Sequence, residues 1–277
     1  MLTAALLALA DLVSASSAYE VHGPIRRPPA AQLVWSEEFD QGVLDQRRWS
    51  FETSHNKTGW FNGERQYYSA NRPENLRIAG GNLIIEARAE KLDPKAYADW
   101  GGQSYTSARI ISAKAWRYGF FEVRAKLPCA RGTWPAIWML PRNMQHWPDD
   151  GEIDIMEQVG AEPNLIYATL HTGRYNHTKG TQRGARRLVP TSCDSFHRYQ
   201  LDWQADSITI GVDDEAILRV DRKRGDGKAE WPFDRPFQMI VNLAVGGSWA
   251  GAKGIDDAAM PQRMEVDYVR VWQSPRP

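Results

Sequence analysis

The sequence predicts an all-β protein built as a sandwich of two antiparallel sheets, with one concave face free for binding. Short segments in which apolar and polar residues alternate recur over residues 33–274. Clusters of Gly, Pro, Asn and Asp separate these segments, as expected for turns between strands. After the N-terminal leader, no segment keeps apolar residues at helical spacing for three turns. No repeat or change of composition marks a second domain, so we expect residues 33–274 to form one domain.

The first 18 residues resemble a secretory signal peptide, because an apolar run is followed by small residues that end at Ala18. The run lacks a basic start and is interrupted by Asp11, so a wrongly assigned first residue is the alternative. We expect residues 1–18 to be a removable leader and the protein to be secreted or periplasmic. Residues 19–32 are Pro-rich and predict a lead-in without regular structure.

Charge and composition limit the partners that the protein could bind. Lys plus Arg and Asp plus Glu each number 34, so the formal net charge is zero. A partner held by bulk charge, such as nucleic acid or an anionic membrane, is therefore not expected. Trp is frequent, with 12 Trp beside 10 Tyr and 8 Phe. Such a surplus often lines a binding surface, and we expect a monomer that binds its ligand through one.

The predicted strands follow one another along the chain. Residues 75–89 contain two alternating runs around Gly80 and Gly81, which predicts a hairpin. Residues 108–128 contain another pair of runs, which turns near residues 117–119. Further strand patterns continue the series at residues 165–172, 196–220, 236–247 and 264–272.

The segment WPDDGEIDIMEQVG, residues 147–160, concentrates five carboxylates among apolar residues. Residues two apart on a strand share a face, so Glu152 and Asp154 are expected to point the same way. Glu157 would point the opposite way unless one extra residue, a β-bulge at 155–156, turned it back. The bulged strand would carry three acids on one face. Two other interpretations are an exposed acidic strand edge and a metal site, because carboxylate oxygens suit Ca²⁺.

Three acids on one strand face suit glycoside hydrolysis, which needs two close carboxylates with different pKa values. One carboxylate attacks the anomeric carbon, and the other protonates the leaving oxygen. A retaining mechanism needs the two carboxyl groups about 5–5.5 Å apart, whereas an inverting one needs a wider gap for a water molecule. Acids on one strand face fit the closer spacing. Asp154 would lie between the two glutamates and hold their charges in unequal states.

The motif GEIDIME resembles the active-site signature E-x-D-x-x-E of glycoside hydrolase family 16 in its bulged form. Similar motifs follow in the family's order between Trp35 and Trp272, namely WSEEFD, FNGERQYY, YTSARI, YGFFEVRAKLP, GTWPAIWMLP, ATLHTG, WPFDRPFQMIVNLAVGGSW and VDYVRVW. The resemblance implies a β-jelly-roll sandwich with a concave substrate cleft. It also implies retaining, endo-acting hydrolysis of β-glucans or galactans, with no cofactor for catalysis.

Residue by residue, the resemblance implies that Glu152 is the nucleophile, Asp154 its electrostatic helper and Glu157 the acid/base. The extra Met156 resembles the laminarinase branch of the family rather than the unbulged lichenase type. Cys129 departs from the pattern, since relatives often have Gly there.

Other residues in these motifs are expected to bind the sugar. Trp134 and Trp138 lie four apart, so we expect both on one strand face, where indoles match the apolar faces of sugar rings. Core packing is the alternative for each of them. His171 is expected on a neighbouring strand in contact with Glu157, with a structural histidine as the alternative. The remaining candidates for sugar binding are Asn62, Glu64, Arg109 and Trp147.

Two further sites are expected away from the acids. An exported chain with only Cys129 and Cys193 predicts that they form a disulfide, although two separate buried thiols are the alternative. The family resemblance implies a structural Ca²⁺ ion on the convex face, held by Glu38, Gly81 and Asp267.

These features together predict endo-cleavage of β-1,3-glucan of the laminarin type, with mixed-linkage β-1,3-1,4-glucan as a second substrate. The zero net charge and the Trp-lined face favour an uncharged glucan over a sulfated galactan. Three alternatives stay open: a mixed-linkage glucanase (lichenase) as the main activity, a galactanase of the agarase or carrageenase type, and a non-catalytic glucan-binding protein. The presence of both Glu152 and Glu157 favours an enzyme over a binding protein.

Overall fold

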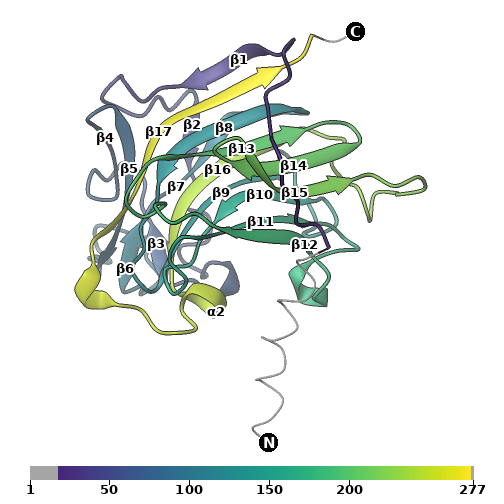
Figure 1. Cartoon of the computed structure of the whole chain (residues 1–277). Coiled ribbons are helices and arrows are strands. Elements are labelled where there is room, and N and C mark those ends of the chain that lie inside the picture. Colours follow the sequence, from purple (N-terminus) through teal and green to yellow (C-terminus); the bar gives the residue numbers. More distant parts are fainter. Residues whose placement is uncertain (1–17, 276–277) are drawn as a thin grey trace, which may run out of the picture.

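The computed structural model describes residues 18–275, which form two packed β-sheets (Figure 1). The predicted leader, residues 1–18, lies almost entirely outside the described residues and stays a prediction. Within residues 18–275, no helix combines the length and the apolar character that crossing a membrane requires. The helical segments are short: η1 (Phe61–Gly63), η2 (His177–Lys179), α2 (Gly247–Ala250) and η3 (Asp257–Ala259).

Ten strands form the first sheet, in the order β15-β14-β13-β8-β17-β5-β6-β3, with β1 paired to β17 and β4 paired to β5. Neighbouring strands are antiparallel, except that β3 and β6 run parallel. The strands are β1 (Gln32–Glu37), β3 (Gln66–Tyr68), β4 (Leu76–Ala79), β5 (Asn82–Ala89), β6 (Tyr105–Ser107), β8 (Gly119–Lys126), β13 (His197–Trp203), β14 (Ser207–Val212), β15 (Glu215–Asp221) and β17 (Gln262–Gln273).

Seven strands form the second sheet, in the order β12-β11-β10-β9-β16-β7-β2, and all of its neighbouring strands are antiparallel. The strands are β2 (Trp49–Phe51), β7 (Arg109–Trp116), β9 (Thr133–Pro141), β10 (Glu152–Glu157), β11 (Leu165–His171), β12 (Arg183–Leu188) and β16 (Phe237–Val245). The acidic segment forms β10, near the middle of this sheet. The predicted two-sheet sandwich is therefore confirmed.

Apolar side chains from the facing sides of the two sheets fill the core. On β9, Ile137 and Met139 are fully buried in this core, whereas Trp134 and Trp138 are partly exposed on the other face. Tryptophan serves both faces. The buried tryptophans are Trp49, Trp60, Trp116, Trp203, Trp231 and Trp272. Half of the Trp residues are therefore buried, and most of the partly exposed half remains available to a binding surface.

The hairpin predicted at Gly80 and Gly81 is confirmed, because β4 and β5 pair across these two residues, which have φ of 61° and 77°. The second predicted pair does not form a hairpin. β7 and β8 turn at residues 117–119 but belong to different sheets. Trp116 and Phe121, one from each strand, meet edge to face in the core with ring centres 5.8 Å apart. An alternating pattern shows which side chains are buried, but it does not show which strands share hydrogen bonds.

The lead-in at residues 19–32 is more ordered than its composition predicts. Residues 19–25 run along the outer edge of β15, and their backbone N–H groups donate to carbonyls there and in the preceding turn over 3.0 and 2.9 Å. Ile25 is buried beside the aromatic rings of β8 and β17. The expectation of no regular structure is therefore wrong for this part, because an edge strand offers unpaired backbone groups that a passing segment can satisfy.

Cys129 and Cys193 are joined as a disulfide in the structure. Cys129 follows β8 and Cys193 precedes β13, so the bond links segments 64 positions apart. The side-chain amide of Gln158, directly after β10, donates to the Cys129 Sγ and to the Pro128 carbonyl, each over 3.1 Å. The disulfide therefore lies beside the end of the acidic strand.

We expect removal of this disulfide to lower the free energy of unfolding. In the chain-entropy model, a closed loop of this length stabilises the folded state by roughly 4 kcal/mol. Urea denaturation of C129A/C193A should show a loss of that order. A thiol titration of the unreduced, denatured wild-type protein should find no free thiol, and two free thiols would contradict the pairing.

Candidate active site

A bulge in β10 turns Glu157 to the same face of the sheet as Asp154. Against β9, Asp154 pairs with Trp138 and Glu157 pairs with Ala136. Between these two pairs, β10 advances by three residues while β9 advances by two. The register against β11 shifts at the same place. Residues 155–156 are both buried in the core. The predicted bulge is therefore confirmed, and its core anchors let three acids share the exposed face.

Glu152 begins β10 and is partly exposed. The Trp147 Nε1–H donates to the Glu152 Oε2 over 2.9 Å. Burial raises the pKa of the Glu152 carboxyl, while hydrogen bonds from Trp147 and Asp154 and the positive charge of Arg109 act in the opposite direction. Two hydrogen bonds and one cation thus favour its ionised form.

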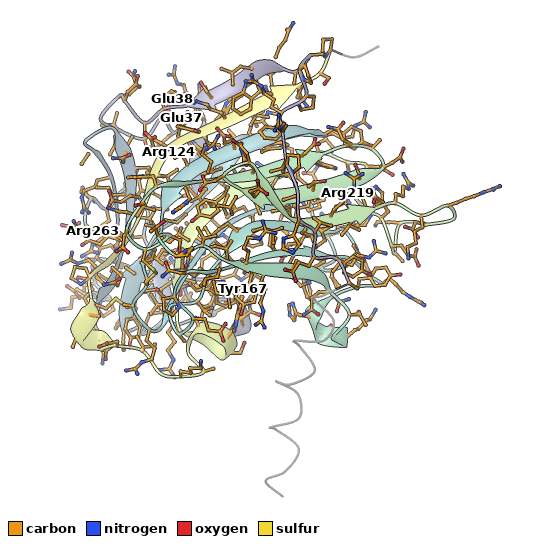
Figure 2. The ribbon with its side chains drawn as sticks, viewed as in Figure 1. Glu37, Glu38, Arg124, Tyr167, Arg219 and Arg263 are labelled. Atoms are coloured by element: carbon orange, nitrogen blue, oxygen red, sulfur yellow. A yellow bond between two sulfur atoms is a disulfide. The ribbon has the colours of Figure 1, made fainter. Side chains whose placement is uncertain are left out.

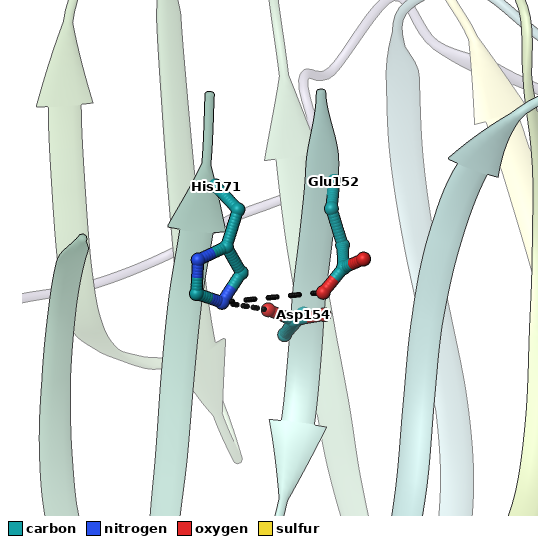
Figure 3. A group of neighbouring side chains, drawn as sticks. All are labelled: Glu152, Asp154 and His171. Carbon is teal, nitrogen blue, oxygen red and sulfur yellow. Dashed lines mark ion pairs between the residues drawn. The ribbon is translucent and has the colours of Figure 1, made fainter. Parts of the chain in front are cut away.

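Asp154, on the same strand, and His171, on the neighbouring strand β11, adjoin Glu152 (Figure 3). The His171 Nε2 lies 3.4 Å from the Asp154 Oδ2 and 3.9 Å from the Glu152 Oε1. Burial, together with nearby His177, lowers the pKa of His171 to about 3, so the ring is neutral near pH 7. Burial and the charges of Glu152 and Glu157 raise the pKa of Asp154 well above its usual value. Asp154 therefore keeps a proton that it can donate to Glu152.

The predicted contact between His171 and Glu157 is wrong. The register of β10 and β11 places His171 opposite Glu152, and Tyr167 opposite Glu157. Two residues on neighbouring strands meet only when the turn and the bulge set that register, and neither is visible in the ATLHTG motif alone.

Glu157 ends β10 and accepts a hydrogen bond from the Trp134 Nε1–H over 3.0 Å. Burial is the main cause that raises the pKa of Glu157, and the charges of Glu152 and Glu64 raise it further, while Trp134 lowers it. Glu152 has more support for its negative charge than Glu157, so the two surroundings favour an ionised Glu152 and a protonated Glu157. This is the unequal protonation that a glycosidase requires.

A row of side chains crosses the sheet beside the acids. Strand register aligns Glu157 with Ala136, Ala136 with Asn242, and Asn242 with Arg109. The Trp138 Nε1–H donates to the Asn242 Oδ1 over 2.7 Å, which fixes the indole on this face. The small Ala136 leaves space between the polar groups. The row therefore offers polar side chains next to a partly exposed indole, as a sugar-binding face requires.

Arg109 is held between two indoles. Its guanidinium carbon lies 4.8 Å from the ring centre of Trp138 and 5.1 Å from that of Trp60, within the range of cation–π attraction. The side chain is buried, and its Nε has no hydrogen-bond partner among the described residues. Arg109 is therefore placed by stacking rather than by an ion pair.

Asn62 and Glu64 lie at and after η1, near α2. The Gln66 Nε2 donates to the Glu64 Oε2 over 2.9 Å, and burial raises the pKa of Glu64. Asn62 is exposed and has a left-handed backbone with φ of 57°. Glu64 is near enough to Glu157 for its charge to raise the pKa of that residue, whereas Trp147 and His171 stand beside Glu152 itself.

Sequence reasoning missed several members of this face. These are Trp60, Tyr68, Tyr167, His177, Asn242 and Trp249. Asn242 had a usable signal, since it is the only polar side chain in the run MIVNLAV. His177 had none, because its ring meets Trp147, at 4.9 Å between ring centres, only through loop packing.

Among residues 18–275, one group places carboxylate and imidazole atoms close enough to meet a metal ion: Glu152, Asp154 and His171, within 4.8 Å of one another. We do not assign a metal to it. The hydrogen bonds of the two acids are those of a shared-proton pair, and a flat strand face provides few further ligands.

Known proteins resemble this chain over most of its length. The model of glycosyl hydrolases family 16 matches residues 56–270. A beta-glucanase of Rhodothermus marinus is 46% identical over 258 residues, covering 89% of this chain and 87% of that protein. A glucan endo-1,3-beta-glucosidase of Cryptopygus antarcticus is 38% identical over 252 residues, covering 87% and 91%. The crystal structure of a non-specific endo-beta-1,3(4)-glucanase superposes with a TM-score of 0.91 at 46% identity, covering 96% of this chain and 99% of that one. The chain therefore belongs to glycosyl hydrolase family 16.

Proposed function

We propose that this protein is an endo-acting, retaining hydrolase of β-1,3-glucan, in which Glu152 is the nucleophile and Glu157 the general acid and base. The observation that carries the proposal is the placement of both glutamates on one sheet face in unequal surroundings. The substrate class is supported by the relatives, which are a beta-glucanase, a glucan endo-1,3-beta-glucosidase and an endo-beta-1,3(4)-glucanase.

In the first step, the ionised Glu152 attacks the anomeric carbon while Glu157 gives its proton to the leaving oxygen. The bond to the leaving sugar breaks, and a glycosyl ester forms on Glu152. Asp154 donates to Glu152 and holds the carboxylate that attacks. As negative charge leaves Glu152, the repulsion that kept the proton on Glu157 falls, and Glu157 becomes acidic enough to release it.

In the second step, Glu157 acts as a base. It takes a proton from water, and the resulting hydroxide attacks the anomeric carbon of the ester. Glu152 leaves as a carboxylate, and two inversions give net retention. Trp134 keeps a hydrogen bond to Glu157, which orients the same carboxyl for both steps.

The two roles predict different responses to removing each carboxylate. E152Q should lose activity on every substrate, because it has no nucleophile. E157Q should lose roughly 10²–10⁴-fold on laminarin, the contribution of a general acid. A dinitrophenyl glycoside needs no protonation, so E157Q should release a burst of dinitrophenol while E152Q releases none. Equal residual rates of the two variants on that substrate would reverse or abolish the assignment.

An uncharged glucan suits the face better than a sulfated galactan. The formal net charge is zero. Among the described residues, this face has one buried cation, Arg109, and its guanidinium is stacked between two indoles. Trp138 offers a flat apolar surface to a sugar ring. The similarity to a non-specific endo-beta-1,3(4)-glucanase supports mixed-linkage glucan as a second substrate.

Incubation with laminarin, lichenan, carboxymethyl cellulose, agarose and carrageenan, followed by reducing-sugar assay and chromatography, checks the substrate. Oligosaccharides of several lengths should appear early from laminarin, and also from lichenan. Cellulose and both galactans should remain intact. A higher rate on lichenan would make mixed-linkage glucan the main substrate, cleavage of the galactans alone would overturn the substrate class, and binding without products would indicate a glucan receptor.

Two further properties belong to the proposal. We infer an exported, monomeric protein, which is supported by the leader pattern at residues 1–18. A structural Ca²⁺ ion would need the carboxylates of Glu38 and Asp267. Arg270 donates to both Glu38 oxygens over 3.1 and 2.8 Å, and Arg124 pairs with Asp267 (Figure 2 labels Glu38 and Arg124). A calcium ion could bind only after both guanidinium groups moved away, so this arrangement does not fit the ion and no catalytic step depends on it.

A further inference from the structure

Asp150 is a buried acid that the proposed reaction does not use. It belongs to the 145–151 loop, which leads directly into β10, and its side chain is only 4% exposed. Its carboxylate accepts four hydrogen bonds. The backbone N–H groups of Gln145 (2.8 Å) and His146 (3.0 Å) donate to one oxygen, and the side chains of Lys228 (2.9 Å) and Arg235 (2.7 Å) donate to the other. Such complete pairing is what makes a buried carboxylate tolerable.

The carboxylate of Asp150 ties the loop to another part of the fold. Lys228 and Arg235 both come from residues 222–236, the connection between β15 and β16. Burial alone would raise the pKa of Asp150, but the hydrogen bonds from Lys228 and the backbone hold it well below its usual range. Asp150 is therefore ionised at neutral and mildly acidic pH.

The anchored loop carries Trp147. The Asp150 N–H donates to the His146 carbonyl over 3.0 Å, and the Gly151 N–H donates to the Pro148 carbonyl over 3.1 Å, so hydrogen bonds close the loop on both sides of the indole. Gly151 has φ of 90°, and a Cβ there would lie 2.7 Å from a side-chain carbon in the 222–236 connection. The loop backbone thus has little freedom to shift.

We propose that Asp150 is a positioning residue. It accepts hydrogen bonds from the two backbone N–H groups that precede Trp147, and it thereby holds the Trp147 indole where the indole Nε1–H donates to Glu152. The inference deepens the proposed function, because it rests on Glu152 being the nucleophile. Trp147 supplies a direct N–H donor to that carboxylate. A displaced indole would leave the negative charge on Glu152 less stabilised, although no reacting group had been removed.

The consequence for pH follows from the groups around Glu152. Charged or titratable neighbours come from three strands: Asp154 and Glu157 on β10, His171 on β11, and Arg109 on β7. From η2, the ring of His177 packs against both Trp147 and His171. A donor to a carboxylate lowers its pKa, so loss of the Trp147 bond raises the pKa of Glu152. The ionised fraction at a given acidic pH then falls, and the acidic limb of the kcat/KM profile moves to higher pH.

The test compares pH profiles of kcat/KM on laminarin for wild type, D150A, W147F and D150A/W147F. D150A and W147F should each move the acidic limb upward by about one pH unit, which lowers kcat/KM about tenfold below the limb. The double variant should show the same shift as W147F alone, because both changes act through one hydrogen bond. An unmoved limb in D150A, or shifts that add in the double variant, would overturn the proposal.

D149N is the matched control, since Asp149 is the adjacent, exposed acid and makes no side-chain hydrogen bond among the described residues. Its limb should stay in place. If D150A does not fold, D150N and R235Q replace it, because each weakens the anchor and nearly keeps side-chain volume. Each should move the limb in the same direction, and a folded D150N or R235Q with an unmoved limb would overturn the inference.

A second readout does not depend on turnover, so it separates failure of this inference from failure of the proposed function. In ¹⁵N-labelled protein, the Trp147 indole N–H resonance can be assigned by its absence from W147F. It should lie downfield and titrate with Glu152 in wild type, and lose both properties in D150A. The same downfield, titrating resonance in D150A would show that the indole needs no such anchor, whatever the protein does to laminarin.

Discussion

One extra residue in β10 is the constraint on which the active face depends. Without the bulge, Glu157 would point into the core and residue 156 outward, which would bury a charge and expose a Met. The bulge is stable because residues 155–156 are both packed between the sheets. Apolar packing on one side of the strand therefore fixes the position of the carboxyl groups on the other side. The disulfide at Cys129 adjoins Gln158 and supports the same strand from its end.

The fold makes two identical side chains unequal. Glu152 accepts hydrogen bonds from the Trp147 indole and from Asp154. Glu157 accepts one hydrogen bond, from the Trp134 indole, and is repelled by the charges of neighbouring acids. Each indole comes from a different element: the 145–151 loop for Trp147 and β9 for Trp134. The proposed chemistry therefore relies on distant parts of the chain that act through two N–H donors, and Asp150 is the anchor of one of them.

Most of the fold and the placement of the acids could be predicted from the sequence, because both depend on local periodicity and on one recognisable bulge. The partner of His171 could not, since it depends on the register between two strands. The sheet to which β8 belongs could not be predicted either, because an alternating pattern does not show which strands pair with each other. The ordering of residues 19–25 and the role of Asp150 depend on contacts with distant segments, and no local pattern encodes such contacts.

In the proposed reaction, Glu152 forms a covalent bond to the sugar while Glu157 moves protons. A 2-deoxy-2-fluoro laminaribiosyl fluoride forms the glycosyl ester readily but slows its hydrolysis, so the intermediate accumulates. Mass spectrometry of the intact protein and of its peptides locates the ester. We expect one added disaccharide, attached to Glu152, in the wild-type protein and none in E152Q. An adduct on Glu157, or complete turnover of laminarin with inverted products and no adduct, would contradict it.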